Sequence, residues 1–211
     1  LIVPVSGGSD SALCFWLCSQ ALPGKAMAVH AGSVIREEAW FRSVGPFEFT
    51  DVPGTHAERE EMRWARFLAM SLARRVWLVG SRNRTEDELG TYSLASRTAT
   101  FLPLVGAWKS DVQRICGAVG VPGSIIESSR RADPDCGRPA ELAEIPFEAI
   151  EVFLRVRSDS ASRESLRSLT PPQVAYLDAI RSRNSFKRTL PIRCASVELR
   201  SPAQVPGYLS D

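Results

Sequence analysis

The sequence has few of the residues that build metal centres and covalent cross-links. Among its 211 residues are two histidines and five cysteines, and no two cysteines form a CxxC pair. This composition predicts neither a zinc site nor a disulfide framework. Cys14 and Cys18 lie four residues apart on an expected helix, and we interpret them as small core residues.

Long apolar runs and an excess of one charge are also absent. No apolar stretch approaches the roughly 20 residues that a membrane-spanning helix needs. Lysine and arginine number 26 against 24 acidic residues, which gives a net charge of +2. This balance gives no electrostatic argument for nucleic acid as a partner. With 44% hydrophobic and 24% charged residues, we expect a cytoplasmic enzyme or binding protein of ordinary globular composition.

Short apolar segments alternate with helical patterns along the chain. Such alternation is typical of an α/β fold, a doubly wound parallel sheet covered by helices on both faces. We predict one domain over residues 1–188 and an irregular tail over 189–211. In the expected helix 58–73, the apolar residues at helical spacing are Met62, Ala65, Ala69 and Leu72. The expected strands are 1–5, 25–30, 47–52 and 75–80, and the principal helices are 10–21, 35–42, 58–73, 109–119, 147–155 and 171–183.

The stretch Val5-Ser-Gly-Gly-Ser-Asp-Ser11 follows the first strand and leads into the first helix. In a doubly wound sheet, ligands bind beyond the carboxyl ends of the strands, where this stretch falls. Its two glycines allow a tight turn, and the helix behind it adds unpaired N–H groups and a positive dipole end. Together with three serine hydroxyls, these groups predict a phosphate site. Asp10 fits such a site only if a divalent cation lies between its carboxylate and the phosphate.

This Ser-Gly-Gly-x-Asp-Ser motif resembles that of the PP-loop ATP pyrophosphatase superfamily. Further blocks of the sequence resemble the ammonia-dependent NAD synthetases within that superfamily, and they occur in the family's order. For example, the family has Gly-Thr-Gly-Asn-Lys-Ser-Glu where this sequence has residues 80–86. The blocks are Gly80-Ser-Arg-Asn-Arg-Thr-Glu86, Leu102-Pro-Leu104 with Trp108-Lys-Ser-Asp-Val112, Arg131-Ala-Asp133, Glu141-Leu-Ala-Glu-Ile-Pro-Phe147 and Asn184-Ser-Phe-Lys-Arg188.

The resemblance implies an ATP-dependent ligase that forms a C–N bond, with Mg²⁺ as cofactor and ATP as a substrate. NAD synthetases adenylate the carboxylate of nicotinic acid adenine dinucleotide, release pyrophosphate, and let ammonia displace AMP. Because family members are typically homodimers, we expect a homodimer, with no nucleic-acid or membrane partner. A glutaminase domain does not fit within 211 residues. We therefore expect the nitrogen to come from free ammonia or from a separate ammonia-supplying subunit.

Carried onto the matching positions, the resemblance assigns roles to individual residues. Asp10 and Glu86 would hold Mg²⁺, and no residue is assigned to acid–base catalysis. Without the resemblance, Glu86 is an ordinary first-turn acid, Lys109 a solvated helix residue and Lys187 part of a basic surface. The residues that would contact ATP are Ser6, Gly7, Gly8, Ser9, Asp10, Ser11, Ser81, Lys109 and Arg131, and those that would contact the second substrate are Arg59, Arg63, Asp133 and Lys187.

One segment departs from the family. Where this sequence has residues 91–97, the family has Tyr-Phe-Thr-Lys-Tyr-Gly-Asp, whose lysine and aspartate contact the dinucleotide. This sequence has neither residue there, although Arg97, Arg130 and Arg131 offer positive charge. Three alternatives therefore stay open: a relative that adenylates another carboxylate, a PP-loop sulfur transferase that uses Cys136, and a nucleotide-binding homologue without turnover.

Overall fold

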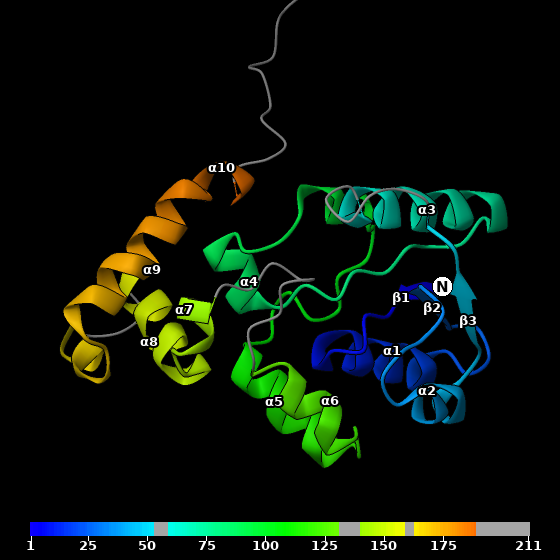
Figure 1. Ribbon diagram of the computed structural model, residues 1–211, viewed down its shortest axis with the longest axis horizontal. Coiled ribbons are helices and arrows are strands. Elements are labelled where there is room, and N and C mark those ends of the chain that lie inside the picture. Colours follow the sequence, from blue (N-terminus) through cyan, green and yellow to red (C-terminus); the bar gives the residue numbers. More distant parts are fainter. Residues whose placement is uncertain (53–58, 131–139, 159–162, 189–211) are drawn as a thin grey trace, which may run out of the picture.

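The structure, a computed structural model, confirms the predicted α/β class, because helices surround a small parallel sheet (Figure 1). No helix within the described ranges is long and apolar enough to cross a membrane. Four predicted features lie outside the described residues: the site residues Arg131 and Asp133, Cys136 of the alternative sulfur transferase, and the tail 189–211. The structure describes residues 1–52, 59–130, 140–158 and 163–188.

The sheet contains three parallel strands in the order β1 (Ile2–Pro4), β2 (Met27–Ala31) and β3 (Phe47–Thr50). Val3 of β1 pairs with Ala28 of β2, and both are fully buried. Parallel strands are usually covered on both faces, which explains why these strands are short apolar runs. Because all three strands point the same way, their carboxyl ends lie along one edge of the sheet.

The predicted fourth strand is shorter than expected. Arg75 has a φ of 54°, in the left-handed region, so extended backbone does not begin at this residue. Leu78 then forms a single parallel bridge with Ile2, and Val79 forms one with Phe101. The sheet therefore continues beyond β1 by isolated bridges instead of a full strand.

Helices cover both faces of the sheet, as predicted (Figure 1). On one face lies α3 (Arg59–Arg74), whose Phe67 and Met70 pack with Ile2 and Val29. The second apolar layer packs on the opposite face and includes Val3 and Ala28 of the sheet. The helices of that layer are α1 (Ser9–Ala21), α2 (Glu38–Val44), α5 (Lys109–Ala118) and α6 (Gly123–Ser128).

The buried face of α3 differs from the one that the periodicity predicts. Leu72 is 68% exposed and Met62 is 37% exposed, whereas Phe67 and Met70 are buried. Two apolar stripes run along this helix, and the one that includes Trp64 and Phe67 carries more apolar area. Since the stabilisation from burial grows with apolar area, this aromatic stripe packs on the sheet. The face formed by Met62, Ala65, Ala69 and Leu72 is directed toward solvent.

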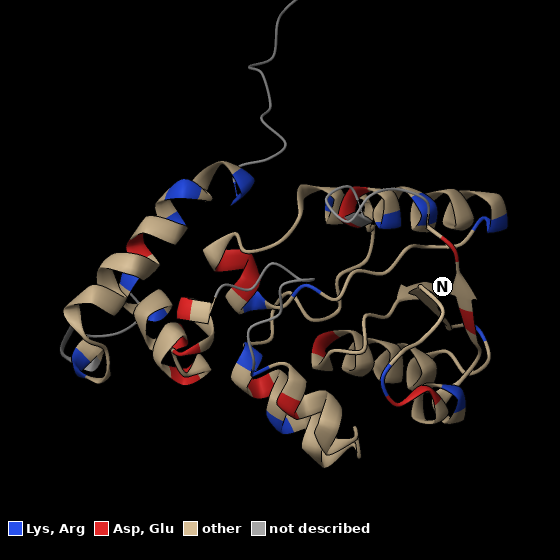
Figure 2. Ribbon diagram, in the orientation of Figure 1, with Lys and Arg blue, Asp and Glu red and all other residues tan. Residues whose placement is uncertain are grey.

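The C-terminal helices form a separate core beside the sheet. Phe153 and Leu177 are fully buried there, and they pack with Leu89 and Trp108 from the middle of the chain. Lysine and arginine gather at the end of α9 and on α10 (Figure 2). The elements of this region are α4 (Arg84–Leu89), α7 (Ala140–Ala143), α8 (Phe147–Arg157), η3 (Arg163–Ser168), α9 (Pro171–Arg183) and α10 (Ser185–Arg188). The short helix η2 (Leu94–Thr98) packs instead against α3.

Candidate phosphate and metal site

The loop between β1 and α1 makes a tight turn at the carboxyl end of β1. Gly7 has a φ of 82°, which favours glycine, and a Cβ at this position would meet Cγ1 of Ile35 at 3.3 Å. Ser11 Oγ accepts the backbone N–H of Ser6 at 3.1 Å and donates to the Gly8 carbonyl at 3.0 Å. These bonds close the loop on itself directly in front of α1.

Ser9 begins α1 and is fully buried. Its N–H donates to Ser129 Oγ over 3.1 Å, and that hydroxyl donates to Ser9 Oγ over 2.7 Å. The N-cap residue Gly8 has no side chain to accept the first helical N–H groups. The positive end of α1 therefore takes an acceptor from a distant segment. A serine hydroxyl meets the Ser9 N–H at the position where the sequence predicts a phosphate oxygen.

Asp10 connects this loop to two other segments. Its Oδ1 accepts Asn83 Nδ2 at 2.9 Å, and its Oδ2 forms an ion pair with Lys109. Lys109 Nζ also donates to Ser9 Oγ at 2.9 Å. The side chain of Lys109 is only 7% exposed, so it is a buried cation beside the loop and not a solvated helix residue.

Glu86 lies in the first turn of α4, next to Asp10. Asn83 caps this helix, because its Oδ1 accepts the Glu86 N–H at 3.0 Å and Glu86 Oε2 accepts the Asn83 N–H at 3.3 Å. The same Asn83 side chain bonds Asp10, so it holds the two carboxylates at one site. Burial and then the charge of Asp10 raise the pKa of Glu86 from 4.5 to about 7, while Lys109 lowers it.

These two carboxylates suit a magnesium ion. Mg²⁺ binds oxygen ligands and is commonly held by one or two carboxylates together with substrate phosphates and water. The raised pKa of Glu86 shows that its negative charge is costly despite Lys109, so a further cation would be favourable. Within the described ranges, no group of three or more His, Cys, Asp or Glu side chains is placed to hold a metal. The other ligands of a magnesium ion held by these two carboxylates would be phosphate oxygens and water.

Replacing Glu86 by glutamine is expected to stabilise the ligand-free protein more at pH 8 than at pH 5. The folded pKa of about 7 exceeds the ordinary 4.5, so the carboxyl contributes stability below pH 4.5 that is lost as the pH rises through 7. Glutamine keeps the oxygen that accepts the Asn83 N–H and removes the charge. Denaturant unfolding should show a difference of about 1–3 kcal/mol between the two pH values.

The matched control for this prediction is Glu127→Gln, which removes the charge of an exposed glutamate on α6. We expect its effect on the free energy of unfolding to be nearly the same at pH 5 and pH 8. If Glu86→Gln also behaves identically at both pH values, the carboxyl is not protonated in the folded protein, and its assigned environment is wrong.

The residues predicted to bind the second substrate form their hydrogen bonds and ion pairs away from the loop between β1 and α1. Arg63 pairs with Glu60 on the same helix. Lys187 Nζ donates to the Tyr92 carbonyl at 2.8 Å. Among the described residues, neither side chain has a hydrogen bond to the loop between β1 and α1 (residues 5–8), which we call the phosphate loop. Arg59 begins α3, and its side chain lies outside what is described, while Ser81 is half-buried between the Val79 bridge and the Asn83 cap.

A cationic cluster surrounds Tyr92, in the segment 91–97. The Arg82 guanidinium stacks 4.0 Å from the centre of the Tyr92 ring, and Lys187 Nζ and the Arg97 guanidinium lie 5.7 and 5.9 Å from it. Arg97 also donates to the Lys187 carbonyl at 2.5 Å, and Arg82 forms an ion pair with Asp87 at 3.2 Å. Burial and Arg183 lower the pKa of Lys187. This positive region favours an anionic group nearby.

Sequence reasoning missed two residues of the phosphate site. Asn83 lies within the motif of residues 80–86 but was not predicted to have a role, although Asn three residues before Glu86 is the signature of a helix cap. Ser129 follows α6, 120 residues after its partner Ser9. No sequence pattern marks that contact, since only the packing of α6 against α1 brings the two serines together.

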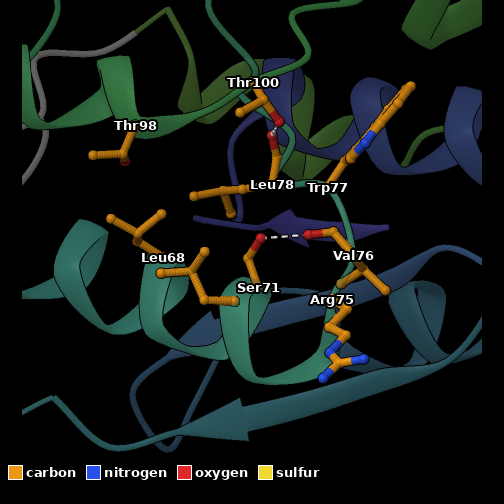
Figure 3. Close-up of a pocket in the computed structure, with 9 residues that line it drawn as sticks. Leu68, Ser71, Arg75, Val76, Trp77, Leu78, Thr98 and Thr100 are labelled. Atoms are coloured by element: carbon orange, nitrogen blue, oxygen red, sulfur yellow. Dashed lines mark hydrogen bonds between the residues drawn. The ribbon is translucent and has the colours of Figure 1, made fainter.

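Two of the cavities on the surface of the described residues bear on the site. The first, of about 340 Å³, lies between the end of α3 and the bridged segment around Leu78, with Leu68, Trp77 and Thr100 in its wall (Figure 3). None of the predicted site residues lines it. The second, of about 320 Å³, is lined by Gln113, Arg130 and the segment 143–148. Gln113 Nε2 lies 3.5 Å from Ser9 Oγ, so the second cavity adjoins the phosphate loop.

Comparison by sequence identifies no relative: no family model matches the chain, and no curated protein does. Comparison by structure finds similar folds. The chain is similar to an NH3-dependent NAD synthetase from Campylobacter jejuni, solved with a nitrate ion, with a TM-score of 0.69 and 17% identity over 92% of this chain and 88% of that one. It is also similar to an NMN synthetase from Francisella tularensis, with a TM-score of 0.68 and 16% identity over 92% and 88% of the two chains.

A third similar structure is an NAD+ synthetase from Burkholderia pseudomallei, with a TM-score of 0.60 and 17% identity over 90% of this chain and 82% of that one. At such low identity, these similarities establish the fold and leave the substrate open. They cover nearly the whole length of the compared chains, so the common fold extends over the sheet and the C-terminal helices alike.

Proposed function

Since the chain has the fold of the NAD synthetases, as its sequence motifs predict, we propose that it is an ATP-dependent amide ligase that forms AMP and pyrophosphate. The observation that carries this proposal is the site at the start of α1. There the Ser9 N–H and the buried Lys109 ammonium adjoin two carboxylates, Asp10 and Glu86, that one asparagine holds together. Such a combination suits a nucleoside triphosphate with its magnesium ion.

In the proposed reaction, a carboxylate oxygen of the second substrate attacks the α-phosphorus of ATP. The bond from that phosphorus to the bridging oxygen breaks, and pyrophosphate leaves with the electron pair. Ammonia then attacks the acyl carbon of the adenylate, AMP departs, and the nitrogen loses a proton to give the amide. Each step develops charge on phosphate oxygens, so preorganised donors supply most of the catalysis.

The chain's own groups would bind the leaving pyrophosphate. The N–H groups at the start of α1 and Lys109 Nζ would donate to the β- and γ-phosphates, and the hydroxyl of Ser129 would give up its place at Ser9. Asp10 and Glu86 would hold Mg²⁺, which when bound neutralises phosphate charge. The ion pair between Lys109 and Asp10 keeps both side chains in place before ATP arrives.

We propose that the second substrate is anionic and recognised partly by the cationic cluster of Arg82, Arg97 and Lys187. Nicotinic acid adenine dinucleotide is the default substrate. The second candidate is nicotinic acid mononucleotide, because a similar structure is an NMN synthetase and because segment 91–97 lacks the family's lysine and aspartate. Each charged hydrogen bond lost from a desolvated site costs roughly 1.5–3 kcal/mol, enough to change which substrate is used.

The deciding measurement is kcat/KM for both nicotinic acid nucleotides, with saturating Mg-ATP and ammonium, from pyrophosphate and amide formation. A value of about 10⁴ M⁻¹s⁻¹ or more identifies an efficiently used substrate. Pyrophosphate release with neither nucleotide, but with another carboxylate, would indicate a divergent ligase. ATP binding with no pyrophosphate release over a panel of carboxylates would contradict the ligase and indicate a nucleotide-binding homologue.

Purified protein is expected to form the amide with ammonium and not with glutamine. Hydrolysis of glutamine by a cysteine needs an accessible thiol with a histidine beside it. The described cysteines Cys14, Cys18 and Cys116 are buried, and His30 Nδ1 is bonded to the Val5 carbonyl at 2.7 Å. Amide formation is followed with each nitrogen source alone, in protein freed of contaminating glutaminase. Equal rates with glutamine and ammonium would refute the expectation.

A further inference from the structure

Glu151 is a buried acid to which neither the sequence nor the proposed mechanism gives a role. It lies on α8 and is 4% exposed. Its Oε1 accepts the backbone N–H of Ser110 at 2.8 Å and the Thr85 hydroxyl at 3.2 Å. Its Oε2 accepts the Ser110 hydroxyl. The carboxylate therefore bonds two separate segments, the beginning of α5 and the beginning of α4.

The bonds at the start of α5 form a cap supplied by other helices. The N-cap residue Trp108 makes no side-chain cap bond. The Lys109 N–H donates instead to Thr85 Oγ1 at 3.0 Å, and the Ser110 N–H donates to Glu151. A negative charge at a helix N-terminus is favourable, because it meets unpaired N–H groups and the positive dipole end. Glu151 thus fixes the first turn of α5 through two direct bonds to Ser110 and one bond relayed by Thr85.

These two capped turns carry the charged groups of the phosphate site. The first residue of α5 is Lys109, whose Nζ meets Ser9 and Asp10. Thr85 is the neighbour of Glu86 in α4. A shift in either turn would move the lysine or the glutamate relative to the loop. A misplacement of about 1 Å is enough to slow a reaction about 100-fold.

We propose that Glu151 is a positioning residue, which holds Lys109 and Glu86 in register with Asp10 and thereby connects the C-terminal helices to the phosphate site. The proposal rests on the proposed function for its catalytic consequence. Its structural part, the placement of Lys109 for Mg-ATP, stands without turnover. A role confined to holding α8 against α5 would affect stability alone.

The test compares wild type with Glu151→Gln, which keeps the size of the side chain and removes its charge. We expect the amides of Lys109 and Ser110 to exchange with solvent about 10-fold faster, as measured by NMR. Calorimetry should show Mg-ATP bound about 5- to 10-fold more weakly. In the ligase assay, kcat should fall about 10- to 100-fold and the KM of the second substrate should change little, since Glu151 acts only through the ATP groups.

The matched control is Glu38→Gln, which removes an exposed glutamate on α2 that pairs with Arg42. It should leave exchange at Lys109, Mg-ATP affinity and kcat unchanged. If Glu151→Gln does not fold, Thr85→Val serves instead, because it removes the hydroxyl that relays Glu151 to the Lys109 N–H and leaves the bonds between Glu151 and Ser110 in place. The same losses are expected from it.

Unchanged Mg-ATP affinity in a folded variant, Glu151→Gln or Thr85→Val, would overturn the proposal. If the wild type binds Mg-ATP but shows no turnover, the ligase proposal fails. The exchange and calorimetry measurements would then still decide the role of Glu151. The two failures are therefore distinguishable.

Discussion

Replacing Asp10 by asparagine is expected to reduce pyrophosphate release by at least about 1,000-fold while leaving the fold intact. Asparagine keeps an oxygen that accepts the Asn83 amide and has nearly the same volume, so the contact of 2.9 Å is retained. It removes the negative charge that pairs with Lys109 and would bind magnesium. Losing a group that stabilises developing phosphate charge costs about 100- to 1,000-fold, and loss of the cation adds to this.

The control is Asp111→Asn, which neutralises an acid near the start of α5 that pairs with the exposed Arg114. It is expected to retain near-normal turnover, which shows that a change of charge on this part of the surface is tolerated. Initial rates at saturating ATP and several magnesium concentrations measure both variants. Near-normal turnover of Asp10→Asn would exclude a role for Asp10 in metal binding.

Replacing Lys109 by methionine is expected to reduce kcat by about 100- to 1,000-fold, because the buried ammonium would neutralise pyrophosphate as it leaves. The change also destabilises the ligand-free protein, since Asp10 and Glu86 lose the positive charge beside them. Removing one partner of a buried ion pair typically costs about 3–5 kcal/mol. The pKa of Glu86 should rise further, because Lys109 lowers it in the wild type.

The double variant Asp10→Asn with Lys109→Met separates the two effects. It removes both charges, so unfolding by denaturant should show much of the lost stability restored, while activity stays at the level of the worse single variant. Lys25→Met, at an exposed lysine before β2, is the control for a lost ammonium group. Full activity of Lys109→Met would contradict phosphate binding by this lysine.

The sequence predicted the parts of this site that depend on local chemistry. The turn at Gly7 and the helix start at Ser9 follow from glycine and serine placed between an apolar run and a helical pattern. The closeness of Asp10 and Glu86 follows from a simple rule, that segments leaving parallel strands meet at one edge of the sheet. The first three strands and the limits of the principal helices were also predicted to within a few residues, because apolar periodicity determines them, whereas the expected strand 75–80 forms only isolated bridges.

What the sequence did not show depends on packing between distant segments. The resemblance assigns Lys109 to the ATP phosphates, but its burial was not predicted, because its local pattern is that of a solvated helix residue and only the approach of α5 to α1 buries it. Ser129 and Glu151 bond residues 120 and 41 positions away, respectively, and neither lies in a recognisable motif. On α3 two apolar stripes compete, and periodicity does not say which of them the sheet covers. Which stripe is buried depends on the apolar area that the whole fold buries, and the sequence of a single segment does not determine that area.

The central position of β1 has a consequence for how the chain is made on the ribosome. β1 precedes every segment that flanks it, since β2 pairs along one side and the segment around Leu78 along the other. A nascent chain that has released β2 and β3 still has an open edge on β1, and it stays open until residue 79 has emerged. Open edges invite pairing with other chains, and parallel sheets form slowly because their contacts are distant in sequence. A pause in synthesis at which β3 has emerged but residue 79 has not should therefore favour aggregation, whereas a pause at which residue 101 has already emerged should not.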